Sequence, residues 1–221
     1  MRILILLPLY LGVGFGESLL AQELLANPSF EDEPHAAKSP RGWYDCGEPG
    51  ESPIDVHSDT TEFFGVREVP VEGETFVGMV VRSNGTRERL SQRIPANFYP
   101  DVEYEFSIYL SYTLDYWSLV RNPGTGEYDV GQPVSFGEPA ALSLSLGNAY
   151  CNESQVIKVW PAETAGAFQE VSVRFSPDTV YSYILLQAEY SNDFDEDAYN
   201  GNILIDAASL AVVEAEGEVR D

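Results

Sequence analysis

The sequence has 221 residues and 36 Asp and Glu against 12 Lys and Arg, which gives a formal net charge of −24. A surface this acidic repels nucleic acid and anionic lipid, so we expect neither as a partner. The charge alone does not show a metal site, because a metal needs carboxylates that converge on one point, and we interpret the acidity as solvation.

The first 21 residues have the pattern of a secretory signal peptide. Arg2 supplies the charged start, an apolar run follows at 3–15, and Ala21 is a small residue at a plausible cleavage point. Pro8 interrupts the run, which is short for a permanent membrane span. We therefore expect export to the periplasm, the cell surface or the medium, without membrane insertion.

Residues 22–213 are predicted to form one domain, followed by an acidic tail at 214–221. Apolar and polar residues alternate along most of this domain, which is typical of β-strands. The pattern indicates strands, in chain order, at 75–82, 88–94, 104–112, 141–147, 168–175, 182–190 and 202–213. Two stretches do not alternate, 114–139 and 191–202, and long loops on a β scaffold often carry binding sites.

The chain has two cysteines, Cys46 and Cys151. In an exported protein an even pair favours one disulfide, and the alternative is two unrelated thiols.

Several motifs occur in a characteristic order: LLANPSFED, GWYDCG, GETFVGM, the pair RERLSQRI and VEYEFSIYLS, FQEVSVRF and ILIDAASL. This order resembles the jelly-roll carbohydrate-binding modules of the galactose-binding-domain-like superfamily, in the versions found on bacterial secreted and cell-surface proteins. The resemblance implies an all-β jelly-roll sandwich of two antiparallel sheets and a polysaccharide or glycan partner. It also implies that 23–34 is the first strand, with Phe30 as its core anchor.

The resemblance further implies a structural Ca²⁺ between the first and last strands. Glu31 and Asp206 occupy the two matching motif positions, and backbone carbonyls near the turn 73–75 would complete the set of oxygen ligands. The alternative is two surface acids that lie close together by chance. Asp193, Asp195 and Asp197 have the initial spacing of an EF-hand but not its later residues, so we interpret them as a solvated loop.

The predicted ligand site combines a polar strand face with nearby aromatic rings. Tyr109 and Gln187 are expected on one concave face with Ser107, Ser111, Ser143 and Ser145. Tyr116 and Trp117, from the long loop, and Trp43 would wall this face, because sugar C–H faces stack on rings. The alternative for Trp43 is a plug at the end of the sandwich, and Trp160 is expected in the core.

The remaining cationic and titratable residues suggest no further site. Arg82, Arg87, Arg89 and Arg93 could recognise an acidic sugar, but such a row more often faces outward beside neighbouring acids. His35 and His57 belong to no recognisable catalytic motif. The sequence therefore predicts a non-catalytic glycan-binding protein; a structural or adhesive domain and a glycan-active enzyme are the alternatives, and the oligomeric state is left open.

Overall fold

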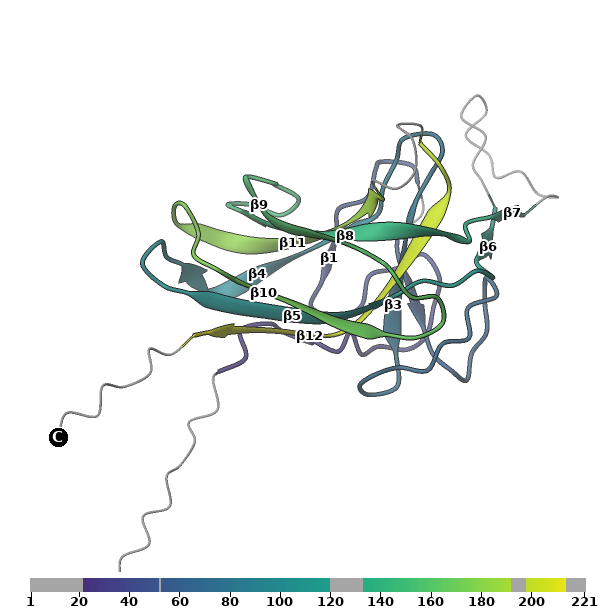
Figure 1. Cartoon of the computed structure of the whole chain (residues 1–221), viewed down its shortest axis with the longest axis horizontal. Helices are drawn as coiled ribbons and strands as arrows, with labels where there is room; N and C mark the ends of the chain where they lie inside the picture. The colour runs from purple at the N-terminus through teal and green to yellow at the C-terminus, as the bar shows by residue number, and fades with distance from the viewer. Residues whose placement is uncertain (1–21, 52, 120–132, 192–197, 214–221) are drawn as a thin grey trace, which may run out of the picture.

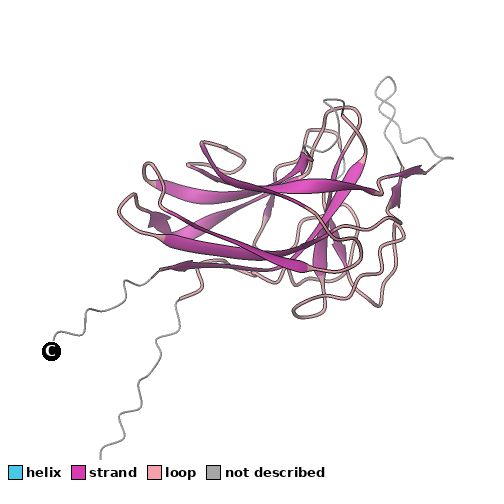
Figure 2. Cartoon of the chain, viewed as in Figure 1, coloured by secondary structure: helices cyan, strands magenta, loops and turns pink. Residues whose placement is uncertain are grey.

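The computed structural model describes residues 22–51, 53–119, 133–191 and 198–213. Within these ranges the chain forms strands and loops and no helix (Figure 2). Accordingly, none of the described residues belongs to a helix that is long and apolar enough to cross a membrane. The all-β prediction is confirmed for this part of the chain.

Seven of the twelve strands follow the predicted segments closely, and five further strands, four of them with two or three residues, were not predicted. The twelve strands are β1 (Tyr44–Asp45), β2 (Asp55–His57), β3 (Phe76–Val81), β4 (Arg89–Phe98), β5 (Tyr104–Ser111), β6 (Trp117–Ser118), β7 (Val134–Ser135), β8 (Glu138–Gly147), β9 (Gln155–Pro161), β10 (Gln169–Phe175), β11 (Tyr181–Tyr190) and β12 (Gly201–Val212).

The strands form one continuous ten-stranded sheet, and β6 and β7 form a separate pair. The sheet curls into two facing layers (Figure 1): β1, β4, β11, β8 and β9 lie in one, and β10, β5, β12, β3 and β2 lie in the other. The layers are joined where β12 pairs in parallel with β8, through Gly201 to Glu138 and Asn202 to Pro139. The prediction of two separate sheets is therefore not confirmed, because this short parallel pairing makes the sheet continuous.

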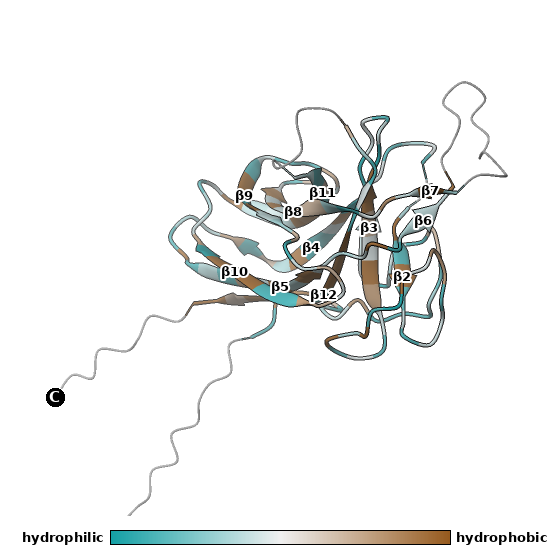
Figure 3. Ribbon diagram, turned by 45° about the vertical axis from the view of Figure 1, so that its right-hand side comes forward, coloured by the Kyte–Doolittle hydropathy of each residue, from teal (hydrophilic) through white to brown (hydrophobic). Residues whose placement is uncertain are grey.

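The core lies between the two layers and follows from the alternation. Phe106 and Ile108 of β5 and Leu142 and Leu144 of β8 are fully buried, and Figure 3 shows the apolar colour concentrated along the strands. Trp160 packs in the same cluster, as predicted.

The opening stretch 23–34 is not a strand, so that prediction is wrong. Asn27 and Phe30 have left-handed backbone angles, with φ of 52° and 55°. The Asn27 side chain also bonds both the N–H and the carbonyl of Glu31, at 2.9 and 3.1 Å. These local bonds close a tight loop instead of an extended ladder. Phe30 is nevertheless fully buried, which confirms it as a core anchor.

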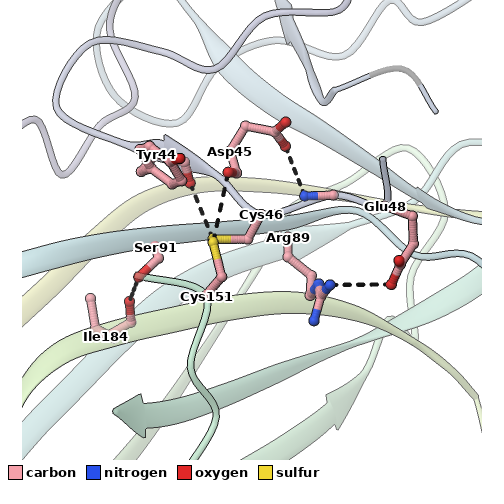
Figure 4. The surroundings of a disulfide bond; sticks show 9 residues. Tyr44, Asp45, Cys46, Glu48, Arg89, Ser91, Cys151 and Ile184 are labelled. Carbon is pink, nitrogen blue, oxygen red and sulfur yellow. Dashed lines mark hydrogen bonds and ion pairs between the residues drawn. A yellow bond between two sulfur atoms is a disulfide. The ribbon is translucent and has the colours of Figure 1, made fainter. Parts of the chain in front are cut away.

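Cys46 and Cys151 form a disulfide, which confirms the predicted pairing. It fastens the segment after β1 to the loop that follows β8 (Figure 4). Beside it, Tyr150 of that loop stacks on Tyr44 at 4.6 Å between ring centroids. The bridge therefore holds a loop against the outer face of the β4–β11–β8 layer.

Candidate functional site

The side chains of the predicted polar strand face do not lie together in the structure. Tyr109 pairs with Glu170 of β10 and with Asp206 of β12, so it lies on the outer face of one layer. Gln187 pairs with Ser143 of β8 in the other layer, and the residue is only 7% exposed. These side chains point away from each other, on opposite outsides of the curled sheet.

Trp43 lies in the core, in agreement with the plug interpretation. Its ring contacts Phe30 at 5.2 Å between centroids, and its indole N–H donates to the carbonyl of Asn27 at 3.0 Å. Only 6% of Trp43 is exposed. Trp43 therefore fastens the opening loop to the core and presents no wall to a ligand.

Tyr116, which was predicted to contact a ligand, lines a cavity that was not predicted from the sequence. The cavity has a volume of about 290 Å³ and lies beside the β6–β7 pair. Its lining combines apolar residues with four charged ones: Ala37, Glu51, Asp55, Phe64, Val80, Arg82, Glu88, Tyr116, Ser118, Leu119 and Phe136. Trp117, the other predicted loop aromatic, directly follows Tyr116 and is 48% exposed. We call this space the end cavity.

One side of the end cavity is a cluster of aromatic rings. Phe64 stacks on Tyr116 at 5.9 Å between centroids with an interplanar angle of 10°, and Phe136 lies 6.1 Å from Tyr116. Phe136 and Tyr116 are almost fully buried, and Phe64 is partly exposed. Of these three rings, Phe64 therefore offers the accessible apolar surface to a ligand.

The other side is a buried network of charged groups. The Tyr116 hydroxyl donates to Asp55 at 2.6 Å, and the second Asp55 oxygen accepts the N–H of Ala37 at 2.8 Å. Arg82 donates to Glu88 and lies 3.7 Å from the Glu51 carboxylate. Such groups fix the orientation of a polar ligand because their own bonds hold them in place.

Burial changes the acidity of this network. It raises the pKa of both Asp55 and Glu88, because desolvation disfavours their charged forms and outweighs the attraction of Arg82. It also raises the pKa of the Tyr116 hydroxyl well above its ordinary value. Raised carboxyl pKa values in a cavity are typical of binding and catalytic sites.

His57 lies against this network and was not singled out by sequence reasoning. Its ring is fully buried and packs between Phe63 and Phe76, at 4.5 and 5.5 Å. Neither ring nitrogen has a hydrogen-bond partner among the described residues. Burial lowers the pKa of His57 to about 3, so the ring is neutral. A Cβ at Gly78 would lie 2.7 Å from its Nε2, so the glycine makes room for the ring.

The arginines at 82, 87 and 89 do not share one environment in the structure. Arg87 pairs with Glu189 at 2.8 Å and Arg89 with Glu48 at 3.2 Å, which confirms an outward face paired with acids. Arg82 instead enters the end cavity with its side chain only 7% exposed. The residues of the hairpin 82–88 therefore belong to two different environments.

The predicted calcium pair, Glu31 and Asp206, meets at one turn, where both carboxylates accept backbone N–H groups. Asp206 accepts backbone N–H bonds of 2.6 and 3.2 Å from the first two residues of the turn 71–75. Glu31 accepts bonds of 3.1–3.2 Å from its last two residues. Calcium takes six to eight oxygen ligands, so further oxygens would have to join these two carboxylates, and the calcium site stays a prediction. Among the described residues, no group of three or more His, Cys, Asp or Glu could hold a metal ion. The pair therefore holds the turn by accepting its N–H groups.

This turn makes a specific prediction at Gly73. Its φ is +69°, and an added Cβ would lie 2.1 Å from Glu31 Oε1. Gly73→Ala should therefore displace the carboxylate and cost about 2–4 kcal/mol, the sum of left-handed strain and lost hydrogen bonds. Gly85→Ala is the matched control, because Gly85 has φ +91° and no atom within 4 Å of the added Cβ. It should cost only about 1 kcal/mol. If urea denaturation gives the same loss of unfolding free energy for both variants, the contact with Glu31 contributes nothing to stability.

No protein-family model and no curated protein matches the sequence. Solved structures do match. One is an arabinose-bound α-L-arabinofuranosidase (TM-score 0.53, 15% identity, 89% of this chain and 27% of that chain). Another is a cyclase from Fischerella sp. TAU in complex with 4-(1H-indol-3-yl)butan-2-one (TM-score 0.52, 13% identity, 87% and 98%).

A family 16 carbohydrate-binding module matches over 86% of this chain and 99% of its own, at 14% identity and a TM-score of 0.45. The chain spans only 21% of a bacteriophage CBA120 tailspike protein and 27% of the arabinofuranosidase. At these identities the tailspike, arabinofuranosidase and cyclase matches show the fold alone.

Proposed function

We propose that the chain is an exported, non-catalytic carbohydrate-binding protein that takes a single sugar ring into the end cavity. The observation that carries the proposal is the division of the cavity into an aromatic side and a charged side. A sugar ring has an apolar C–H face and a rim of hydroxyl groups, so it needs both. Tyr116 joins the two sides, since its ring stacks on Phe64 while its hydroxyl donates to Asp55.

The volume of the end cavity and the expected export of the protein agree with this proposal. A volume of about 290 Å³ lies at the lower end of ligand pockets and suits one ring better than a long chain. The disulfide between Cys46 and Cys151 supports an oxidising compartment.

Isothermal titration of the full chain with a panel of mono- and oligosaccharides tests the proposal. Phe64→Ala should weaken binding about tenfold or more, because burying an aromatic face is worth about 1.5–3 kcal/mol. Tyr109→Ala is the control, because Tyr109 lies on the outer face of β5. Loss of binding in the Tyr109 variant alone would place the site on the outer sheet face, and binding of no sugar would refute the proposed function.

A glycan-active enzyme is the second candidate, and the raised pKa values of Asp55 and Glu88 favour it. A carboxyl group that stays protonated near neutral pH can act as a general acid. Release of reducing sugar from any glycan by the purified protein, lost in Asp55→Asn, would decide for this candidate.

A further inference from the structure

The end cavity has an imbalance of charge that points to the class of sugar. Its described lining contains three carboxyl groups, those of Glu51, Asp55 and Glu88, against one cation, Arg82. His57, the titratable ring packed nearby, is neutral, and the Tyr116 phenol is also neutral. If all three carboxyls were ionised, the lining would carry two uncompensated negative charges.

Two of these carboxyls lie too deep for water to compensate them. Glu88 is 1% exposed and Asp55 is 7% exposed. Arg82, which pairs with Glu88, can compensate only one of them. A buried charge without a partner is costly, so the other carboxyl holds a proton until a cation arrives. The raised pKa values of Asp55 and Glu88 agree with this.

The aromatic side suits a cation as well. Phe64, Tyr116 and Phe136 form a cluster of neighbouring rings beside the carboxyls. The faces of such rings attract an ammonium group, most strongly where water is excluded.

We propose that the end cavity selects an amino sugar, whose ammonium group lies among Glu51, Asp55 and Glu88 while its ring contacts the aromatic side. The inference rests on the proposed function and adds the charge of the ligand. When the ammonium enters, a buried carboxyl releases its proton to solvent, and the carboxylate then pairs with the cation. An acidic sugar is disfavoured by the same groups.

Isothermal titration at pH 7 with glucosamine, N-acetylglucosamine and glucose, and with their β-linked disaccharides, tests the inference. We expect the amine to bind about tenfold or more tightly than the acetylated and hydroxyl analogues, because a hydrogen bond to a charged group is worth about 1.5–3 kcal/mol. Binding should persist at about 0.5 M NaCl, because a buried pair is screened much less than surface charges.

Two variants assign the preference to the cavity. Glu88→Gln and Glu51→Gln should each reduce the preference for the amine to about threefold or less, while melting temperatures check that they fold. Glu170→Gln is the matched control, because Glu170 is an exposed acid on β10, outside the cavity. It should leave the preference unchanged.

The outcomes are distinguishable. Equal binding of glucose and glucosamine refutes the amino-sugar inference and leaves the proposed function standing. A preference that disappears in salt, or that survives in both cavity variants, would show attraction to the acidic surface in general and also refutes the inference. Binding of none of the sugars refutes both proposals.

Discussion

The double variant Cys46→Ala/Cys151→Ala is expected to lower the free energy of unfolding by about 4–5 kcal/mol. The bridge joins residues 105 positions apart, and a crosslink over so long a loop restricts the unfolded chain strongly. Urea denaturation at pH 7 measures the loss. The same variant should also loosen the stack of Tyr150 on Tyr44, because the bridge holds these two rings together.

Reduction provides the control for this prediction. In reducing agent, the wild-type protein should have a urea midpoint close to that of the double variant. The reducing agent should not change the midpoint of the variant itself. A loss below about 1 kcal/mol would mean that the bridge adds little to the folded state, as when strain offsets the gain. Thiol titration of denatured, unreduced wild-type protein should find no free thiol.

The strands were predictable because the alternation has a simple physical cause. Leu142 and Leu144 point to the core and Ser143 points away, as the pleat of a strand requires. The disulfide was predictable from an even pair of cysteines in a chain that was expected to be exported. The conformation of 23–34 was not, because side-chain bonds of Asn27 compete with strand pairing there.

The candidate site was only partly predictable, because alternation gives a face within one strand and not the layer to which the strand belongs. Tyr109 and Ser143 both point away from the core, but their strands lie in opposite layers, so they lie on opposite outer surfaces. The long loop directed attention to Tyr116, which lines the end cavity. Its partner Asp55 lies 61 residues away, and no motif spacing connects the two.

The charges of the end cavity were the hardest feature to foresee. Arg82 and Glu88 flank a hairpin turn, where a charged pair is ordinarily solvated. Here Glu51, Asp55, Ser118 and Phe136 line the same cavity as this pair, and burial follows from these contacts between distant parts of the chain. Sequence reasoning could have found them only through the rarity of a basic residue at the end of the apolar strand TFVGMVV.

Arg82→Met should be among the most destabilising single substitutions in the described chain, at about 3–5 kcal/mol at pH 7, because it leaves Glu88 buried without its cation. Urea denaturation measures the loss. Arg87→Met is the matched control: its pair with Glu189 is more exposed, with 37% of the Arg87 side chain accessible, and should contribute no more than about 1 kcal/mol.

The loss caused by Arg82→Met should depend on pH in a defined direction. Burial already raises the pKa of Glu88, and removal of the neighbouring guanidinium, which lowers this pKa in the wild type, should raise it further. A carboxyl whose pKa is higher in the folded than in the unfolded state contributes stability at low pH and loses it as pH rises through the folded value. The penalty should therefore be smaller at pH 5 than at pH 8.

The double variant Arg82→Met/Glu88→Gln separates charge from packing. It removes the buried negative charge that the single variant leaves uncompensated, so it should recover a large part of the loss and flatten the pH dependence. If the double variant is as unstable as the single one at pH 8, the penalty comes from lost packing around the Arg82 stem. In that case the charge balance inferred for the end cavity would lose its energetic basis, because Glu88 would be tolerated there without a cation.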